Sequence, residues 1–187
     1  GNYTYQWYSC DSDGSNPVII SGETNTSFTP PTSSPGTTYY IVIVTDQDAN
    51  CGSETSNVVS QTVDESITVD AGGDQTVCGN VVVNITGTIA GGASTGTWSA
   101  SAAGTFGNTT DLSTTFTPGA SLLGGGTVDL TLTSAANGTC PAETDQLTLT
   151  INSADAGFSY TYSEYCSDET NPIPTITGDV GAFSSTT

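Results

Sequence analysis

Gly96-Thr97-Trp98-Ser99-Ala100 is the clearest indicator of the fold, because a similar pattern around a tryptophan occurs a second time in the chain. Around the first tryptophan the sequence reads Tyr5-Gln6-Trp7-Tyr8-Ser9. A Phe-Thr-Pro segment follows each of them, at Phe28-Thr29-Pro30 and at Phe116-Thr117-Pro118. Landmarks that recur in the same order at similar spacing indicate one fold repeated along the chain.

The openings of the repeats match as well. Val69-Asp70-Ala71-Gly72 leads to Cys78, and Ala154-Asp155-Ala156-Gly157 leads to Cys166. The two Asp-Ala-Gly triplets are 85 residues apart. We therefore predict three segments: the C-terminal part of one domain (1–64), a complete domain (65–152) and the N-terminal part of a third (153–187).

The apolar pattern predicts strands and no amphipathic helix, as in Leu147-Thr148-Leu149-Thr150-Ile151. About seven short strands separated by turn residues in a domain of this length are typical of an antiparallel sandwich. We expect an all-β fold of tandem immunoglobulin-like antiparallel β-sandwich domains. Trp7 and Trp98 should lie in the cores, on the third strand, with Phe28 and Phe116 facing them.

The charge excludes several classes of function. The chain has no lysine, arginine or histidine and 19 acidic residues, which gives a formal net charge of −19. Nucleic acids and anionic membrane surfaces are bound mainly through basic side chains, so neither is an expected partner. Ser-His-Asp and Cys-His catalysis and histidine-based zinc sites are excluded as well. Glycoside hydrolysis by two carboxylates and Ca²⁺ binding by oxygen ligands remain open.

The distribution of the acidic residues argues against catalysis. Seven lie in 1–64, seven in 65–152 and five in 153–187, mostly in loops and linkers. This spread is typical of solubilising charge, so we expect no enzymatic activity. The sequence also has no apolar run long enough to span a membrane, so direct membrane insertion is not expected.

Calcium is the one cofactor that the residues suggest. Asp11-Ser12-Asp13-Gly14-Ser15-Asn16 begins like a Ca²⁺-binding loop but lacks the bidentate glutamate that completes an EF-hand. Strand counting places this loop at the same end of its domain as the linker Asp64-Glu65. Asp11, Asp13, Asp64 and Glu65 are therefore candidate Ca²⁺ ligands. The alternative is that they are solvated loop residues that bond their own backbone.

The cysteines suggest disulfides in an oxidising compartment. The complete domain contains Cys78 and Cys140, and a bridge between them would close a loop of about 60 residues and contribute roughly 4 kcal/mol. A standard sandwich places these two residues near opposite ends, so bridges across domain junctions are the alternative. For Cys51 the expected partner is Cys10 or an upstream cysteine, and for Cys166 a downstream one.

The chain resembles a known class of repeats. Tyr5-Gln6-Trp7-Tyr8, the stretch 36–45, the run from Asp70 to Cys78 and Phe116-Thr117-Pro118 carry the resemblance. They are similar to immunoglobulin-like and PKD-like modules of large Bacteroidota cell-surface adhesins, including gliding-motility adhesins of the type IX secretion route. The resemblance implies secretion, an extracellular or cell-surface location and a stalk that spaces and presents a distal adhesive region.

Two kinds of partner and one alternative function follow from the resemblance. The partners are neighbouring repeats of the same chain and, for the distal region, surface glycans or other cell-surface proteins. The alternative is a non-catalytic carbohydrate-binding or Ca²⁺-rigidified module attached to a secreted enzyme. In that case the stacking rings would come from Tyr3, Tyr5, Tyr8 or Tyr162.

We predict that salt stabilises the chain, because a net charge of −19 without any basic side chain produces like-charge repulsion in the folded state. Thermal unfolding followed by circular dichroism should give a melting temperature that rises with NaCl concentration. A melting temperature that falls as NaCl is added would contradict the prediction.

Overall fold

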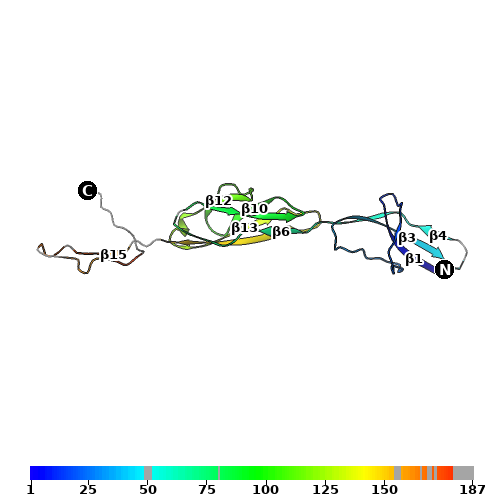
Figure 1. Ribbon diagram of the computed structural model, residues 1–187, viewed down its shortest axis with the longest axis horizontal. Helices are drawn as coiled ribbons and strands as arrows, with labels where there is room; N and C mark the ends of the chain where they lie inside the picture. Colours follow the sequence, from blue (N-terminus) through cyan, green and yellow to red (C-terminus); the bar gives the residue numbers. More distant parts are fainter. Residues whose placement is uncertain are drawn as a thin grey trace. The chain divides into compact units, whose positions relative to one another are not determined.

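The computed structural model describes residues 1–48, 52–79, 81–153, 157–164, 166–167, 170 and 172–178. These residues form strands and one 3₁₀ turn, η1 (Ala120–Leu122), so the fold is all-β, as predicted. The chain divides into two compact units (Figure 1). Unit 1 comprises Gly1–Ile67, Gly91–Ala93 and Ala136–Ala142; unit 2 comprises Thr68–Ala90, Ser94–Ala135 and Glu143–Thr187. Within the described residues, no helix is long and apolar enough to cross a membrane.

Unit 2 contains an immunoglobulin-like sandwich of two main sheets, with strand orders β10-β13-β14-β7 and β11-β12-β8. The strands are β7 (Gln75–Cys78), β8 (Val83–Thr86), β10 (Gly96–Ala100), β11 (Gly104–Phe106), β12 (Ser113–Pro118), β13 (Gly126–Ser134) and β14 (Thr144–Asn152). A further pair consists of β6 (Ile67–Asp70) and β9 (Thr88–Gly91). The connections are short turns, as the glycine-rich and serine-rich sequence predicts.

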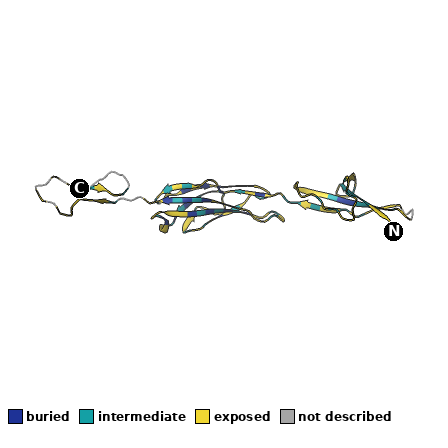
Figure 2. Ribbon diagram, turned by 90° about the horizontal axis from the view of Figure 1, so that it is seen from below, coloured by how far each residue is buried: buried dark blue, intermediate teal, exposed yellow. Residues whose placement is uncertain are grey.

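The core of unit 2 lies between the two main sheets. Every second residue of β13 and β14 is buried, which is the pattern of strands with one covered face (Figure 2). Trp98 of β10 and Phe116 of β12 enter the core from opposite sheets and are 2% and 0% exposed. The indole N–H of Trp98 is buried and has no hydrogen-bond partner among the described residues.

One pair of strands departs from the expected antiparallel arrangement. β7 pairs with β14 in parallel, from Leu149↔Gln75 to Asn152↔Cys78. The two strands are distant in sequence, so no hairpin fixes their relative direction. β7 and β14, which are the first and the last strand of this sheet in the sequence, therefore run side by side in the same direction.

Gly87 lets the backbone approach the tryptophan directly. It lies between β8 and β9, and its N–H donates to the carbonyl of Leu112 at 2.9 Å. A Cβ at this position would meet the side chain of Leu132 and would lie 2.9 Å from Cζ2 of Trp98. No side chain larger than hydrogen fits here without displacing the core.

We predict that Gly87→Ala destabilises unit 2 by about 2 kcal/mol, the usual cost of an added methyl group in a packed core. Urea unfolding followed by tryptophan fluorescence measures the change. Gly73→Ala is the matched control, because a Cβ at Gly73 has nothing within 4 Å. Equal stability of the two variants would show that the contact with Trp98 imposes no constraint.

Unit 1 contains one sheet with the order β2-β1-β3-β4, and β5 also pairs with β3. The strands are β1 (Tyr3–Cys10), β2 (Val18–Ile19), β3 (Gly36–Asp46), β4 (Ser53–Thr55) and β5 (Val59–Val63). Its register repeats that of unit 2, since Trp7↔Val42 corresponds to Trp98↔Leu132. β1, β3 and β5 are thus the counterparts of β10, β13 and β14.

The core of unit 1 is smaller than that of unit 2. Tyr40 and Ile41 are buried in the sheet, whereas Trp7 and Phe28 are only half-buried (Figure 2). The ring centroids of Trp7 and Phe28 are 5.6 Å apart, and those of Phe28 and Tyr40 are 5.3 Å apart. The indole N–H of Trp7 donates to the carbonyl of Asn25 at 2.9 Å.

The C-terminal segment contains one further pair of strands. β15 (Phe158–Ser159) and β16 (Thr175–Ile176) are antiparallel, with Phe158↔Ile176 and Ser159↔Thr175. The N–H groups of Thr177 and Gly178 both donate to the carbonyl of Gly157.

Candidate functional site

Most aspartates in the described part of the chain accept a hydrogen bond from a main-chain N–H group. Because the sequence contains no basic side chain, an amide donor is the strongest positive partner that the fold can give a carboxylate. Among the described residues, seven aspartates accept such a bond: Asp13, Asp46, Asp48, Asp64, Asp70, Asp74 and Asp145. Three of the seven bonds join residues 74 or 75 positions apart, so these carboxylates fasten distant segments together.

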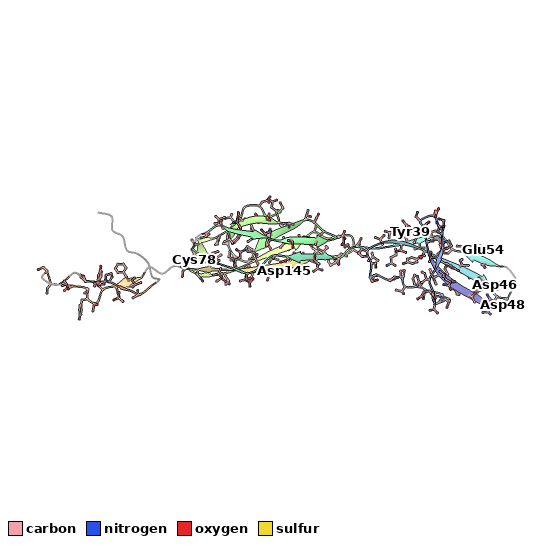
Figure 3. All side chains as sticks on the ribbon, viewed as in Figure 1. Tyr39, Asp46, Asp48, Glu54, Cys78 and Asp145 are labelled. Carbon is pink, nitrogen blue, oxygen red and sulfur yellow. The ribbon has the colours of Figure 1, made fainter. Side chains whose placement is uncertain are left out.

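Two of these bonds flank the parallel pair of strands in unit 2. Oδ1 of Asp74 accepts from the N–H of Thr148, and Oδ2 of Asp145 accepts from the N–H of Ala71, both at 2.8 Å. Asp74 and Thr148 directly precede the first paired residues of β7 and β14. The hydrogen bond between the Asp74 carboxylate and the Thr148 N–H therefore extends the pairing of the two strands by one bond. We call residues 71–78 and 145–152 together the β7–β14 clamp (Figure 3 labels Asp145 and Cys78).

The turn at the start of the β7–β14 clamp explains why the sequence has Asp-Ala-Gly at positions 70–72. The N–H of Gly72 donates to Oδ1 of Asp70 at 2.8 Å. Gly72 has φ +87°, and a Cβ there would lie 3.0 Å from the carbonyl oxygen of Thr86. Glycine therefore allows the chain to turn from β6 toward β7. Ala71, between the two, is fully buried.

The structure contains no disulfide among the described residues: Cys10, Cys78, Cys140 and Cys166 are free, and Cys51 lies outside those residues. Cys78 pairs with Asn152, the last residue of β14, whereas Cys140 precedes the first residue of that strand. The nine residues of β14 span about 26 Å, far more than the 7 Å that a disulfide allows between Cα atoms. The predicted bond between Cys78 and Cys140 is therefore not formed in this structure.

The acidic loop after β1 is closed by its own hydrogen bonds. Oδ2 of Asp11 accepts from Nδ2 of Asn16 at 2.7 Å, and Oδ1 of Asp13 accepts from the N–H of Ser15 at 2.9 Å. Hydrogen bonds from the side chain and backbone of Ser15 lower the pKa of Asp13. Partial burial, followed by the charges of Asp11 and Asp13, raises the pKa of the Cys10 thiol.

Asp64 is held by a different loop of unit 1. Its Oδ2 accepts from the backbone N–H of Thr139 at 2.7 Å and from the hydroxyl of the same residue at 3.0 Å. These bonds lower the pKa of Asp64, the backbone bond more than the hydroxyl bond. The neighbouring carbonyl of Glu65 accepts from Nδ2 of Asn137 at 3.0 Å.

The four predicted calcium ligands, Asp11, Asp13, Asp64 and Glu65, are not brought together. Among the described residues, no group of three or more acidic or cysteine side chains is placed to hold a metal ion. The strand register explains why. Cys10 lies opposite Tyr39, and Tyr39 lies opposite Ser60. Asp64 is four residues beyond Ser60, or about 13 Å along the strand direction.

The four tyrosines suggested as stacking rings do not form one platform. Tyr5 and Tyr8 are half-buried in β1 and, three positions apart, lie on opposite faces of the sheet. Tyr3 is 51% exposed at the start of this strand, and Tyr162 is 66% exposed in the C-terminal segment.

The chain has similarities to one family model and to solved structures. Residues 1–65, which include β1 to β5, match the family model described as "Domain of unknown function (DUF8696)". No curated protein matches the chain. Among solved structures, the chain is similar to fibronectin(III)-like modules of CbhA from Clostridium thermocellum. The identity is 13% and the TM-score 0.34, and the match covers 80% of this chain and 78% of that chain.

The β7–β14 clamp was not predicted from the sequence. Asp74 directly precedes β7 and Asp145 is the second residue of β14, at strand ends where an acidic residue usually serves solubility. Their partners are main-chain N–H groups, which every residue except proline has, so the sequence cannot mark them. The one available signal was the Asp-Ala-Gly triplet, which is repeated at the start of the second and third predicted domains.

We predict that the pKa of Asp64 lies below its ordinary value of about 3.9. Because the pKa is lowered by folding, this carboxylate stabilises the fold above its ordinary pKa, and the contribution is lost as the pH falls through the lowered value. Carboxyl NMR titration measures it directly. In Thr139→Val the hydroxyl bond is removed and the pKa should rise.

Asp13 is the internal control for this titration, because its own lowered pKa depends on Ser15 and should be the same in both proteins. An Asp64 pKa that is unaltered by Thr139→Val would mean that the hydroxyl bond has no energetic role.

Proposed function

We propose that this chain is a structural spacer of a secreted, cell-surface adhesin or filament, and that its modules carry tension between neighbouring parts of the protein. The observation that carries the proposal is the parallel pairing of β7 with β14, at the two ends of the sandwich sequence. The repetition of the same strand register in unit 1 supports a tandem array.

Parallel terminal strands resist stretching because of how they are loaded. Tension pulls β7 from its N-terminal side and β14 from its C-terminal side, so two parallel neighbours are pulled in opposite directions along their length. All four residue pairs of the ladder and the carboxylate bonds of Asp74 and Asp145 are then loaded together. If both terminal strands were pulled from the same end of the pair, their hydrogen bonds would instead break one after another.

The chemistry of the carboxylates favours a spacer over an enzyme. A glycosidase needs a carboxyl group with a raised pKa to act as the acid. In the described part of the chain, hydrogen bonds lower the pKa of Asp13 and of Asp64. Asp74 and Asp145 are occupied in holding strands together.

The surroundings that fit this spacer are extracellular. The resemblance of the repeats to Bacteroidota adhesin modules supports secretion and display at the cell surface. Acidic residues occur along all three segments of the sequence, so neighbouring stalks would repel each other. Surface glycans or other cell-surface proteins would be bound by a distal region that this stalk presents.

Single-molecule force spectroscopy tests the proposal. Unfolding of the predicted complete domain, residues 65–152, should lengthen the chain by roughly 280 Å, from the extended length per residue minus the folded span. The Asp74→Ala/Asp145→Ala variant should unfold at a lower force, because it loses both carboxylate bonds that flank the clamp.

Asp111→Ala is the matched control, because it removes an exposed loop carboxylate outside the clamp. Its unfolding force should equal that of the original chain. The proposal that the clamp resists tension fails if Asp74→Ala/Asp145→Ala also leaves the unfolding force unchanged, or if the chain extends without a discrete unfolding step.

A further inference from the structure

Cys140 is fixed at the end of a tight turn of unit 1. The N–H of Asn137 donates to the carbonyl of Cys140 at 3.1 Å, and the N–H of Cys140 donates to the carbonyl of Asn137 at 2.8 Å. Gly138 and Thr139 form the two-residue turn between them. Gly138 has φ +56°, a conformation that favours glycine. Cys140 therefore has a defined position relative to the rest of the turn.

This turn holds the segment that follows β5. The Asp64 carboxylate accepts from the N–H and the hydroxyl of Thr139, and the carbonyl of Glu65 accepts from Nδ2 of Asn137 at 3.0 Å. With the segment bound in this way, Sγ of Cys140 lies 3.9 Å from the main-chain carbonyl oxygen of Asp64. The sulfur of Cys140 is thus held beside the main chain at Asp64.

Asp64 corresponds to Asn152 in the repeated strand register. Val63 of β5 pairs with the first residue of β3, and Ile151 of β14 pairs with the first residue of β13; both first residues are glycines. Asp64 directly follows Val63, and Asn152 directly follows Ile151. The two residues therefore occupy the same place at the end of the last strand of their modules.

In unit 2 the strand neighbour of Asn152 is Cys78. The two residues are the last pair of the parallel ladder, and the N–H of Gly79 donates to the carbonyl of Asn152 at 3.0 Å. Paired residues on neighbouring strands are about 4.8 Å apart. Cys78 is exposed with a free thiol and lines a pocket together with Asn152 and Ser153 (Figure 3 labels Cys78). The carbonyl that accepts from Gly79 in unit 2 thus matches the one that faces Cys140 in unit 1.

The two cysteines therefore lie beside the same position of the repeat, but they approach it from different modules. Cys78 belongs to the module that this position ends, whereas Cys140 belongs to the predicted domain that follows Asp64. Within one module the two cysteines are separated by the length of β14, about 26 Å. Across a boundary between consecutive modules, both would contact one residue, which makes a disulfide geometrically possible.

We propose that, in the tandem array, Cys140 forms a disulfide with the cysteine of the preceding module that corresponds to Cys78. The sequence repeats both kinds of cysteine. One kind follows the Asp-Ala-Gly triplet, at Cys78 and Cys166, and the other precedes the last strand, at Cys51 and Cys140. The inference rests on the tandem arrangement in the proposed function and not on the resistance of the modules to tension.

The bond requires a disulfide oxidant, such as glutathione disulfide. The thiolate of one cysteine attacks this oxidant, releases one glutathione thiolate and leaves a mixed disulfide on the protein. The thiolate of the second cysteine then displaces the second glutathione. In total, two protein thiols lose two protons and two electrons, and the oxidant is reduced to two glutathione thiols.

The test uses the full chain lengthened by one module. Residues 1–151 are followed directly by residues 64–187, so the predicted complete domain occurs twice. The boundary between the copies then has the segment that starts at Asp64. This segment is chosen because the one from Asn152 to the next Asp-Ala-Gly triplet is three residues shorter.

Two variants of the lengthened chain are compared, each with two cysteines and with serine at every other cysteine position. The boundary-pair variant keeps Cys78 of the first copy and Cys140 of the second, which should meet at the boundary. The reversed-pair variant is the matched control and keeps Cys140 of the first copy and Cys78 of the second. The reversed pair is much closer in sequence and would close the shorter loop, so an unfolded chain would oxidise it more readily.

Both variants are equilibrated with glutathione disulfide under native conditions, and the free thiols are counted after unfolding. The boundary pair should lose both thiols and the mass of two hydrogen atoms while the chain remains a monomer. The reversed pair should keep its thiols or carry glutathione. In urea the preference should reverse, because only loop length then decides which pair forms.

Two results would overturn the proposal. One is a boundary pair that keeps its thiols or binds only glutathione under native conditions. The other is a reversed pair that forms its disulfide as fully as the boundary pair. Neither result changes the unfolding force expected for the clamp, so the cross-link and the resistance to tension can fail separately.

Discussion

The structure depends on one electrostatic constraint: no cation in the sequence is available to neutralise a carboxylate. An aspartate that approaches the packed part of the fold must then accept its hydrogen bonds from main-chain N–H groups, from neutral polar side chains or from water. Asp64, Asp74 and Asp145 use this bond to connect segments more than seventy residues apart in sequence. The acidic side chains, whose charge excludes many chemistries, thus link distant segments of the fold, because a carboxylate can accept a hydrogen bond from any free amide N–H.

The packing of tryptophan is the second organising contact. In unit 2 the indole of Trp98 lies between two sheets, and the backbone at Gly87 closes over it. In unit 1 the same strand register holds Trp7, where the ring of Phe28 packs against the indole and Tyr40 packs against Phe28. The difference in burial between the two tryptophans comes from what faces the sheet, since the tryptophan strand pairs with its neighbour in the same register in both units.

The parts of the structure that follow from side-chain pattern were predictable from the sequence. The alternation in 147–151 and the repeated Trp and Phe landmarks indicated an all-β sandwich, and Trp98 and Phe116 are buried on opposite sheets. The direction of β7 was not predictable, because a parallel pairing between distant strands leaves no local signal. The suggested calcium ligands share one end of unit 1, but a sequence does not state how far one strand extends beyond its neighbour.

The parallel clamp has a consequence for how such a protein can change over time. Two parallel neighbours at the start and finish of one sandwich mean that the chain enters at one end and leaves at the other. No interior contact of the sandwich needs to be rebuilt when another copy is inserted next to it. Gene duplication can therefore lengthen the protein in whole modules, and the reach of whatever it presents becomes a heritable quantity that changes in equal steps.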